Sequence, residues 1–129
     1  MGEINTTLLD KLKIGLANHK GKPNAITSKE IVEKLKPAFP GINGATIRVH
    51  VHYLRTVEKI FICADSSGYY TPANEIEAKH QLASIRSRIK ELREVDIAQK
   101  EAYQKTFGQY AIDFWQVFVT LKHDAHTIN

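Results

Sequence analysis

The chain has 129 residues, of which 43% are apolar and 25% are charged, and this balance predicts one folded domain with a helical appendage rather than two full domains. The single cysteine, Cys63, cannot form an internal disulfide, so we expect a reduced, cytoplasmic protein in which this thiol is a core residue. No run approaches the ~20 apolar residues that span a bilayer, and the amino terminus lacks a signal peptide's basic and apolar stretches. We therefore expect no membrane partner.

The net charge of +4 is unevenly distributed along the chain. Residues 1–74 carry 10 basic and 6 acidic side chains, whereas residues 75–129 carry 8 of each. A basic front joined to a neutral rear indicates an anionic partner for the first part of the chain and another task for the second.

Apolar residues at helical spacing predict a first helix of about three turns at the start of the chain. Thr6 or Thr7 can cap its first turn, and the glycine and proline of the stretch 19–24 end it. Residues 25–26 can then form a very short strand. Most apolar positions of this helix fall on one side, as expected of a helix that packs on a core.

Two further helices are predicted close together. Thr27 and Glu30 have the spacing of a capping box, which begins a second helix that ends before Pro37. After a turn, a third helix is predicted at about 44–57, with Asn43 or the next residue at its start. Two short helices joined by a tight turn are what a helix-turn-helix requires.

A hairpin is predicted after the third helix. β-Favouring residues at 60–64 and 69–71 are separated by a polar turn that contains Gly68. Alternation along the second strand places one ring of the pair Tyr69 and Tyr70 against the core and leaves the other half exposed.

A long helix is predicted from about 74 to near 106, where neither glycine nor proline occurs. Its apolar residues repeat at alternating spacings of four and three, which forms a narrow heptad seam. The aromatic segment 107–121 also follows helical spacing, although the part from 114 onward could be a strand. The seam predicts a homodimer or, alternatively, a helix that packs back on the aromatic segment. The residues assigned to the oligomeric contact are Leu82, Ile85, Ile89, Leu92, Phe114, Trp115 and Phe118.

The predicted order of helix, short strand, helix, turn, helix and hairpin over residues 6–73 is that of a winged helix. Within it lie a Leu-Arg pair at 54–55, an Ile-Cys pair at 62–63 and a Gly-Tyr-Tyr run at 68–70. This constellation resembles the winged helix-turn-helix DNA-binding proteins of bacteriophage and mobile-element replication or regulatory modules. The arginine-containing stretch 82–94 resembles the charged helix that follows in this group. The resemblance covers about 90 residues and implies duplex DNA as a ligand.

The expected fold is therefore mainly α, with a winged helix-turn-helix domain at 1–73, made of three helices and a β-hairpin wing, and long C-terminal helices at 74–129 for oligomerisation or docking. We expect a non-enzymatic protein that binds double-stranded DNA in regulation or replication, without a cofactor. The alternative is an adaptor of the same fold whose C-terminal helices dock a replication or transcription protein. The sequence shows no phosphate-binding glycine loop, no nucleophile beside a histidine base and no set of four metal ligands.

The third helix carries the candidate recognition residues. If Ile47 faces the core, a rotation of ~100° per residue places Arg48, His52 and Arg55 together on the opposite side. Arginine offers paired donors that match guanine, and the amides that open the second helix, near Ser28, can bind a phosphate. A solvated face on a protein-binding domain is the plainer interpretation. The candidate DNA contacts are Ser28, Asn43, Thr46, Arg48, His52 and Arg55, and the lysines placed to position phosphates are Lys20, Lys22, Lys29 and Lys34.

Overall fold

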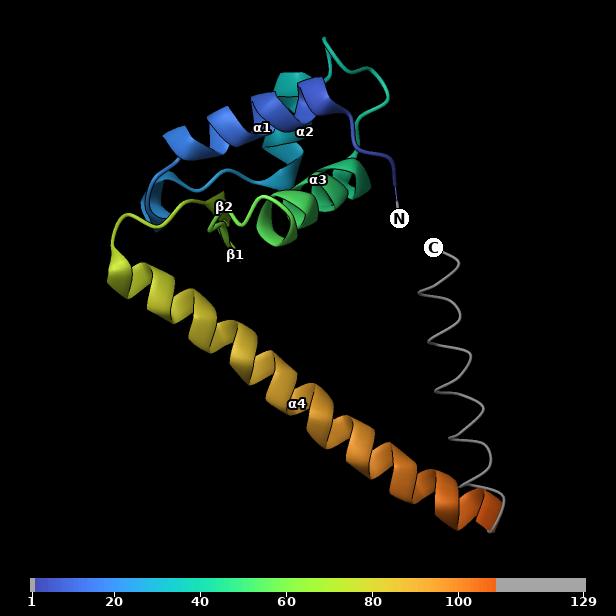
Figure 1. The fold of residues 1–129 in the computed structure, drawn as a ribbon. Coiled ribbons are helices and arrows are strands. Elements are labelled where there is room, and N and C mark those ends of the chain that lie inside the picture. The colour runs from blue at the N-terminus through green and yellow to red at the C-terminus, as the bar shows by residue number, and fades with distance from the viewer. Residues whose placement is uncertain (1, 109–129) are drawn as a thin grey trace. The chain divides into compact units, whose positions relative to one another are not determined.

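The computed structural model describes residues 2–108, and this part of the chain is mainly helical, as predicted (Figure 1). Three short helices precede a two-stranded hairpin and a long helix, which is a winged-helix-like topology. The elements are α1 (Thr6–Asn18), the 3₁₀ turn η1 (Lys22–Asn24), α2 (Ser28–Leu35), α3 (Gly44–Thr56), β1 (Cys63–Asp65), β2 (Gly68–Tyr70) and α4 (Glu75–Phe107). No helix in the described part is long and apolar enough to cross a membrane.

The chain divides into two compact units, Met1–Ala83 and Ser84–Asn129. The first unit thus extends ten residues past the boundary expected at residue 73, because the first turns of α4 are bonded to the loops before them. The carboxylate of Glu77 accepts two backbone hydrogen bonds, at 2.8 and 3.0 Å. One turn later, Gln81 Oε1 accepts a bond of 3.3 Å from the Ala64 amide. These contacts make the start of α4 part of the front unit.

Helix α1 begins at Thr6, so its cap lies one residue before the earliest predicted cap. Asn5 is the cap, and its side chain accepts a hydrogen bond of 3.1 Å from the Leu8 amide. The prediction of Thr6 or Thr7 as the cap was wrong, since both residues lie inside the helix. Asparagine caps at least as well as threonine. The Asn5 amide also donates to Nε2 of His50 at 3.1 Å, which fixes the start of α1 against α3.

The two predicted helix starts in the middle of the front unit are confirmed. Thr27 and Glu30 form a complete capping box at the start of α2. Asn43 and Thr46 form a second box at the start of α3, in which Asn43 Oδ1 accepts from the Thr46 amide at 3.0 Å. Each box satisfies amides that the first helical turn leaves without partners. Both helices therefore begin at fixed residues. The connection between them, residues 36–43, is longer than the tight turn predicted for a helix-turn-helix.

The core lies among α1, α2, α3 and the segments that lead into and out of the hairpin. Ile47 and Leu54 of α3 are fully buried at its centre. Cys63 is fully buried as well, which confirms its expected place in the core, and this burial raises the pKa of its thiol. The remaining buried apolar residues are Leu8, Leu9, Leu12, Leu16, Ile26, Ile31, Ile42, Val51, Ile62 and Tyr70.

The hairpin is shorter than predicted, because its first strand begins at Cys63 rather than near residue 60. Lys59 has a φ of 58°, a left-handed conformation that turns the chain back at the end of α3. The Ile60 amide then donates to Leu54 O at 2.9 Å instead of to a neighbouring strand. The residues before 63 therefore close the end of α3 and leave only a three-residue strand for the hairpin.

The second strand of the hairpin pairs on both of its edges. It lies antiparallel to β1 and exchanges two backbone hydrogen bonds with Ile26, of 2.9 and 2.8 Å, at Tyr69. This bridge confirms the very short strand predicted at 25–26. Tyr70 is buried and Tyr69 is half-buried, which confirms the predicted alternation of the two rings.

Candidate nucleic-acid interface

Helix α3 separates a buried side from an open side. Ile47, Val51 and Leu54 are buried, whereas Arg48 and His52 are exposed and lie one helical turn apart. An exposed arginine and histidine on one face of a helix are groups able to donate to phosphates or to base edges in a major groove. The structure thus brings together two of the three residues expected on this face.

The third residue, Arg55, differs from the expectation. Its side chain is half-buried, and its Nε and Nη2 donate to the carbonyl oxygen of Ile62 at 3.0 and 2.6 Å. This bidentate contact joins the last turn of α3 to the segment that enters β1. Spacing along a helix predicts the face on which a side chain lies, but not the carbonyl group to which it donates a hydrogen bond. Arg55 therefore has a structural contact that sequence reasoning missed, and any DNA contact by it stays a prediction.

The starts of α2 and α3 meet beside Arg48. A methyl group on Gly44 would lie 3.6 Å from Arg48 Nη1 and 3.6 Å from Ser28 Oγ, so the small residue at this position leaves both groups close together. Ser28 Oγ is buried and has no hydrogen-bond partner among the described residues. The exposed start of a helix carries partial positive charge. We name this place, formed by Ser28, Gly44 and Arg48, the helix-start junction.

The other candidate base contacts at the start of α3 are already engaged. Asn43 Oδ1 accepts from the Thr46 amide at 3.0 Å and from the Thr46 hydroxyl at 3.2 Å. In turn, Thr46 Oγ1 accepts from the Asn43 amide at 3.3 Å. A DNA contact by either side chain would share or replace these bonds, so they are weaker candidates than Arg48.

The four lysines predicted to position phosphates are all exposed but lie in different surroundings. Lys29 is in the first turn of α2, next to the helix-start junction. Lys22 Nζ pairs with Asp65 Oδ2 at 3.6 Å. Lys34 lines a pocket between α1 and α2. Lys20 is held through its backbone, in a bridge to the residue that follows β2.

Asp65 at the hairpin turn stabilises the turn itself. Its carboxylate accepts from the Ser67 amide at 2.7 Å and from the Tyr70 hydroxyl at 3.2 Å. Burial raises the pKa of Asp65, but these hydrogen bonds and the nearby charge of Lys22 outweigh it, so that the pKa lies below its usual value. An acid at this position therefore has a structural reason, independent of any DNA contact by the hairpin.

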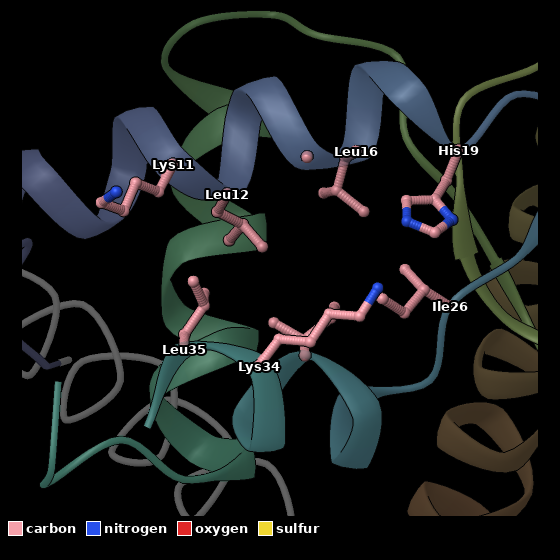
Figure 2. A pocket seen from close by; sticks show the side chains of 9 residues that line it. Lys11, Leu12, Leu16, His19, Ile26, Lys34 and Leu35 are labelled. Atoms are coloured by element: carbon pink, nitrogen blue, oxygen red, sulfur yellow. The ribbon is translucent and has the colours of Figure 1, made fainter. Parts of the chain in front are cut away.

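An apolar pocket of about 130 Å³ lies between α1 and α2 (Figure 2). Its walls are mostly aliphatic, and the side chain of Lys34 extends along it toward Ile26 and His19. The Nδ1 atom of His19 lies 2.7 Å from Asn24 O, so this ring is already held at the edge of the pocket. The pocket was not predictable from residue spacing, because its residues come from three separate segments. The lining residues are Lys11, Leu12, Gly15, Leu16, His19, Ile26, Ile31, Lys34 and Leu35.

The apolar seam predicted on the rear helix lies on α4. Leu82, Ile89 and Leu92 are 40%, 47% and 69% exposed, and Ile85 is half-buried. Such exposure of aligned apolar residues is typical of an interaction surface. The other three residues assigned to oligomerisation, Phe114, Trp115 and Phe118, lie outside the described residues.

In comparisons with known proteins, the chain matches no protein-family model, no curated protein and no solved structure. Within residues 2–108, no group of three or more histidine, cysteine, aspartate or glutamate side chains could hold a metal ion.

Proposed function

We propose that the front unit binds double-stranded DNA without catalysis, with α3 as the recognition helix. The observation that carries this proposal is the pair formed by Arg48 and His52, which is exposed on the open side of α3, the third helix of a winged-helix-like topology. The excess of basic residues in the front of the chain supports the same partner.

The residues of the helix-start junction are suited to two kinds of DNA contact, one to phosphate and one to a base. The start of α2, with Ser28 and Lys29, offers amides and a cation to a phosphate, and phosphate contacts set the register of a protein on DNA. Arg48 is part of this junction and can extend to a base edge, where a bidentate contact to guanine is the commonest specific interaction. The proposal includes the role in regulation or replication that was expected from the sequence.

The test is a titration of random duplex DNA with the full chain at several salt concentrations. We expect affinity to fall steeply as salt rises, because phosphate contacts release counterions. On a duplex that the parent binds specifically, replacing Arg48 and His52 together by Ala should weaken binding by about 1–3 kcal/mol for each base that the variant no longer reads. For each phosphate that the variant no longer touches, the salt slope should decrease by about one. Arg55 is left intact in this experiment, because its bond to Ile62 supports the fold.

The matched control removes one positive charge elsewhere in the front unit. Lys11→Ala changes an exposed lysine on α1 and should alter affinity far less than Arg48→Ala does. If the double variant binds DNA as the parent does, the recognition surface is not on α3.

The pocket of Figure 2 favours a second candidate function, a winged-helix adaptor that binds protein. An apolar pocket of this volume can accept one side chain of a partner, since an engineered cavity of about 150 Å³ binds benzene. This candidate predicts no DNA binding even at low salt. The same titration therefore decides between the two functions.

A further inference from the structure

The residues that flank the apolar seam of α4 are all cationic in its central part. A heptad that places Ile89 at position a and Ile85 and Leu92 at position d puts Arg86 and Arg93 at position e. The residue at position g in the same part is Arg88. These positions border the seam on both sides, so an apolar stripe runs between arginines.

The ion pairs of α4 do not include these arginines. Among the described residues, they are Lys79 with Glu75 in the first turns of the helix and Lys100 with Asp96 further along it. No ion pair of Arg86, Arg88 or Arg93 is present in the described part of the chain. We name the surface made by Ile85, Ile89, Leu92 and these three arginines the basic seam.

A second copy of this chain fits the basic seam poorly. In a parallel pair of helices, position g faces position e of the partner, which would set Arg88 against Arg93 of the other copy. In an antiparallel pair, e faces e and g faces g, which again opposes arginines. Like charges at such positions are how coiled coils reject wrong partners. In the homodimer expected from the sequence, repulsion between these arginines would oppose the packing of the apolar residues.

A membrane surface also fits poorly. Asp96 occupies the next position a and its side chain is 53% exposed, so a carboxylate ends the stripe after four apolar residues. Membrane-surface helices have a broad apolar face. The short, narrow stripe is instead suited to the apolar seam of one other helix.

We propose that the basic seam binds an amphipathic helix of another protein that carries glutamate or aspartate on both sides of its own apolar seam. The apolar residues of the two helices pack together, and the partner's carboxylates pair with Arg86, Arg88 and Arg93. Complementary charges at positions e and g set partner choice in coiled coils. This inference does not depend on DNA binding by the front unit.

The experiment titrates the full chain with two synthetic three-heptad peptides that share leucine and isoleucine at positions a and d. One peptide carries glutamate at positions e and g, and the other carries lysine there. We expect the glutamate peptide to bind at least tenfold more tightly, with an affinity that falls as salt rises. Equal binding of the two peptides would overturn the proposal.

Two variants locate the binding surface. Reversing Arg86 and Arg93 to Glu should exchange the preference between the peptides. The matched control reverses Lys90 and Lys105 to Glu, at heptad positions b and c, away from the seam, and should leave the preference unchanged. Circular dichroism verifies that both variants keep their helix content.

The other occupants are separate outcomes of the same experiment. If neither peptide binds and sedimentation shows a dimer at tens of micromolar, a second copy occupies the seam and the proposal is wrong. If neither binds and the chain is a monomer, the seam is closed to partners, which is equally contrary to the proposal. Binding of phosphatidylserine vesicles that the Arg86 and Arg93 reversal abolishes, without binding of the glutamate peptide, would assign the seam to a membrane surface instead.

Discussion

Two leucines show how differently the two parts of this chain are stabilised. Leu54, in α3, is fully buried among the residues of the front core, whereas Leu92, in α4, is 69% exposed. Within α4 the one buried side chain is Gln81, which belongs to the front unit, and residues 84–108 bury none. The front unit therefore has an apolar core of its own, whereas the apolar residues in the described part of the rear unit are not buried.

The largest expected effect comes from truncating the buried leucine. Leu54→Ala should lower the free energy of unfolding by about 3–5 kcal/mol, because it removes buried methyl groups and leaves a cavity. Leu92→Ala makes the same chemical change on the exposed side of α4 and should change stability by less than about 0.5 kcal/mol. Urea denaturation of both variants measures the contrast. A similar decrease in the two variants would mean that α4 has a buried contact of its own.

A backbone change in the hairpin should have nearly as large an effect. Gly68 has a φ of 118°, and a methyl group there would lie 2.4 Å from Ile26 O, so an alanine is both strained and in collision with backbone. We expect Gly68→Ala to cost at least about 3 kcal/mol. Gly15→Ala is the control, since a methyl group at Gly15 meets no atom within 4 Å and alanine favours a helix by about 1 kcal/mol. Thermal unfolding should show opposite shifts, and a tolerated Gly68→Ala would mean that the bridge between Ile26 and Tyr69 is misplaced.

Two arginines of α3 differ in role, because one has a structural contact and the other is exposed. Arg55→Ala should lower stability by about 1.5–3 kcal/mol, because it removes a charged donor from the buried carbonyl of Ile62. Arg48→Ala should leave stability within about 0.5 kcal/mol of the parent, since its side chain is exposed. Chemical denaturation separates these effects from any weakening of DNA binding. Equal stability of the two variants would refute the structural role of Arg55.

The pH dependence of the front unit should show a late decline of stability in alkali. Burial raises the pKa of Tyr70 to about 12, and its hydrogen bond to Asp65 acts in the same direction. A tyrosine in an unfolded chain has a pKa of about 10. The neutral phenol therefore stabilises the fold fully below about pH 10, and this contribution disappears as the pH rises toward 12.

The measurement is the urea midpoint between pH 9 and about 12 for the parent and for Tyr70→Phe. Both proteins share every other titrating group, so the extra decline of the parent reports the phenol of Tyr70. Identical profiles would show that Tyr70 is not held as a buried neutral donor.

Local patterns in the sequence determined most of the elements. The capping box at Thr27 and Glu30 placed the start of α2, because it depends only on residues three apart. The apolar periodicity of α3 separated Ile47 and Leu54 from Arg48, because an α-helix turns by a constant angle at each residue. The alternation of Tyr69 and Tyr70 followed from the geometry of a strand.

Contacts between distant segments were decided by the tertiary structure alone. The bond from Asn5 to His50 anchors α1, the bond from Arg55 to Ile62 gives a candidate DNA contact a structural role, and the bond from Ala64 to Gln81 joins the start of α4 to the front unit. Each of these bonds joins a side chain to a backbone group whose direction depends on how the intervening chain folds. Sequence spacing specifies the face of a helix or strand on which a side chain lies, but only the packed fold specifies its hydrogen-bond partner.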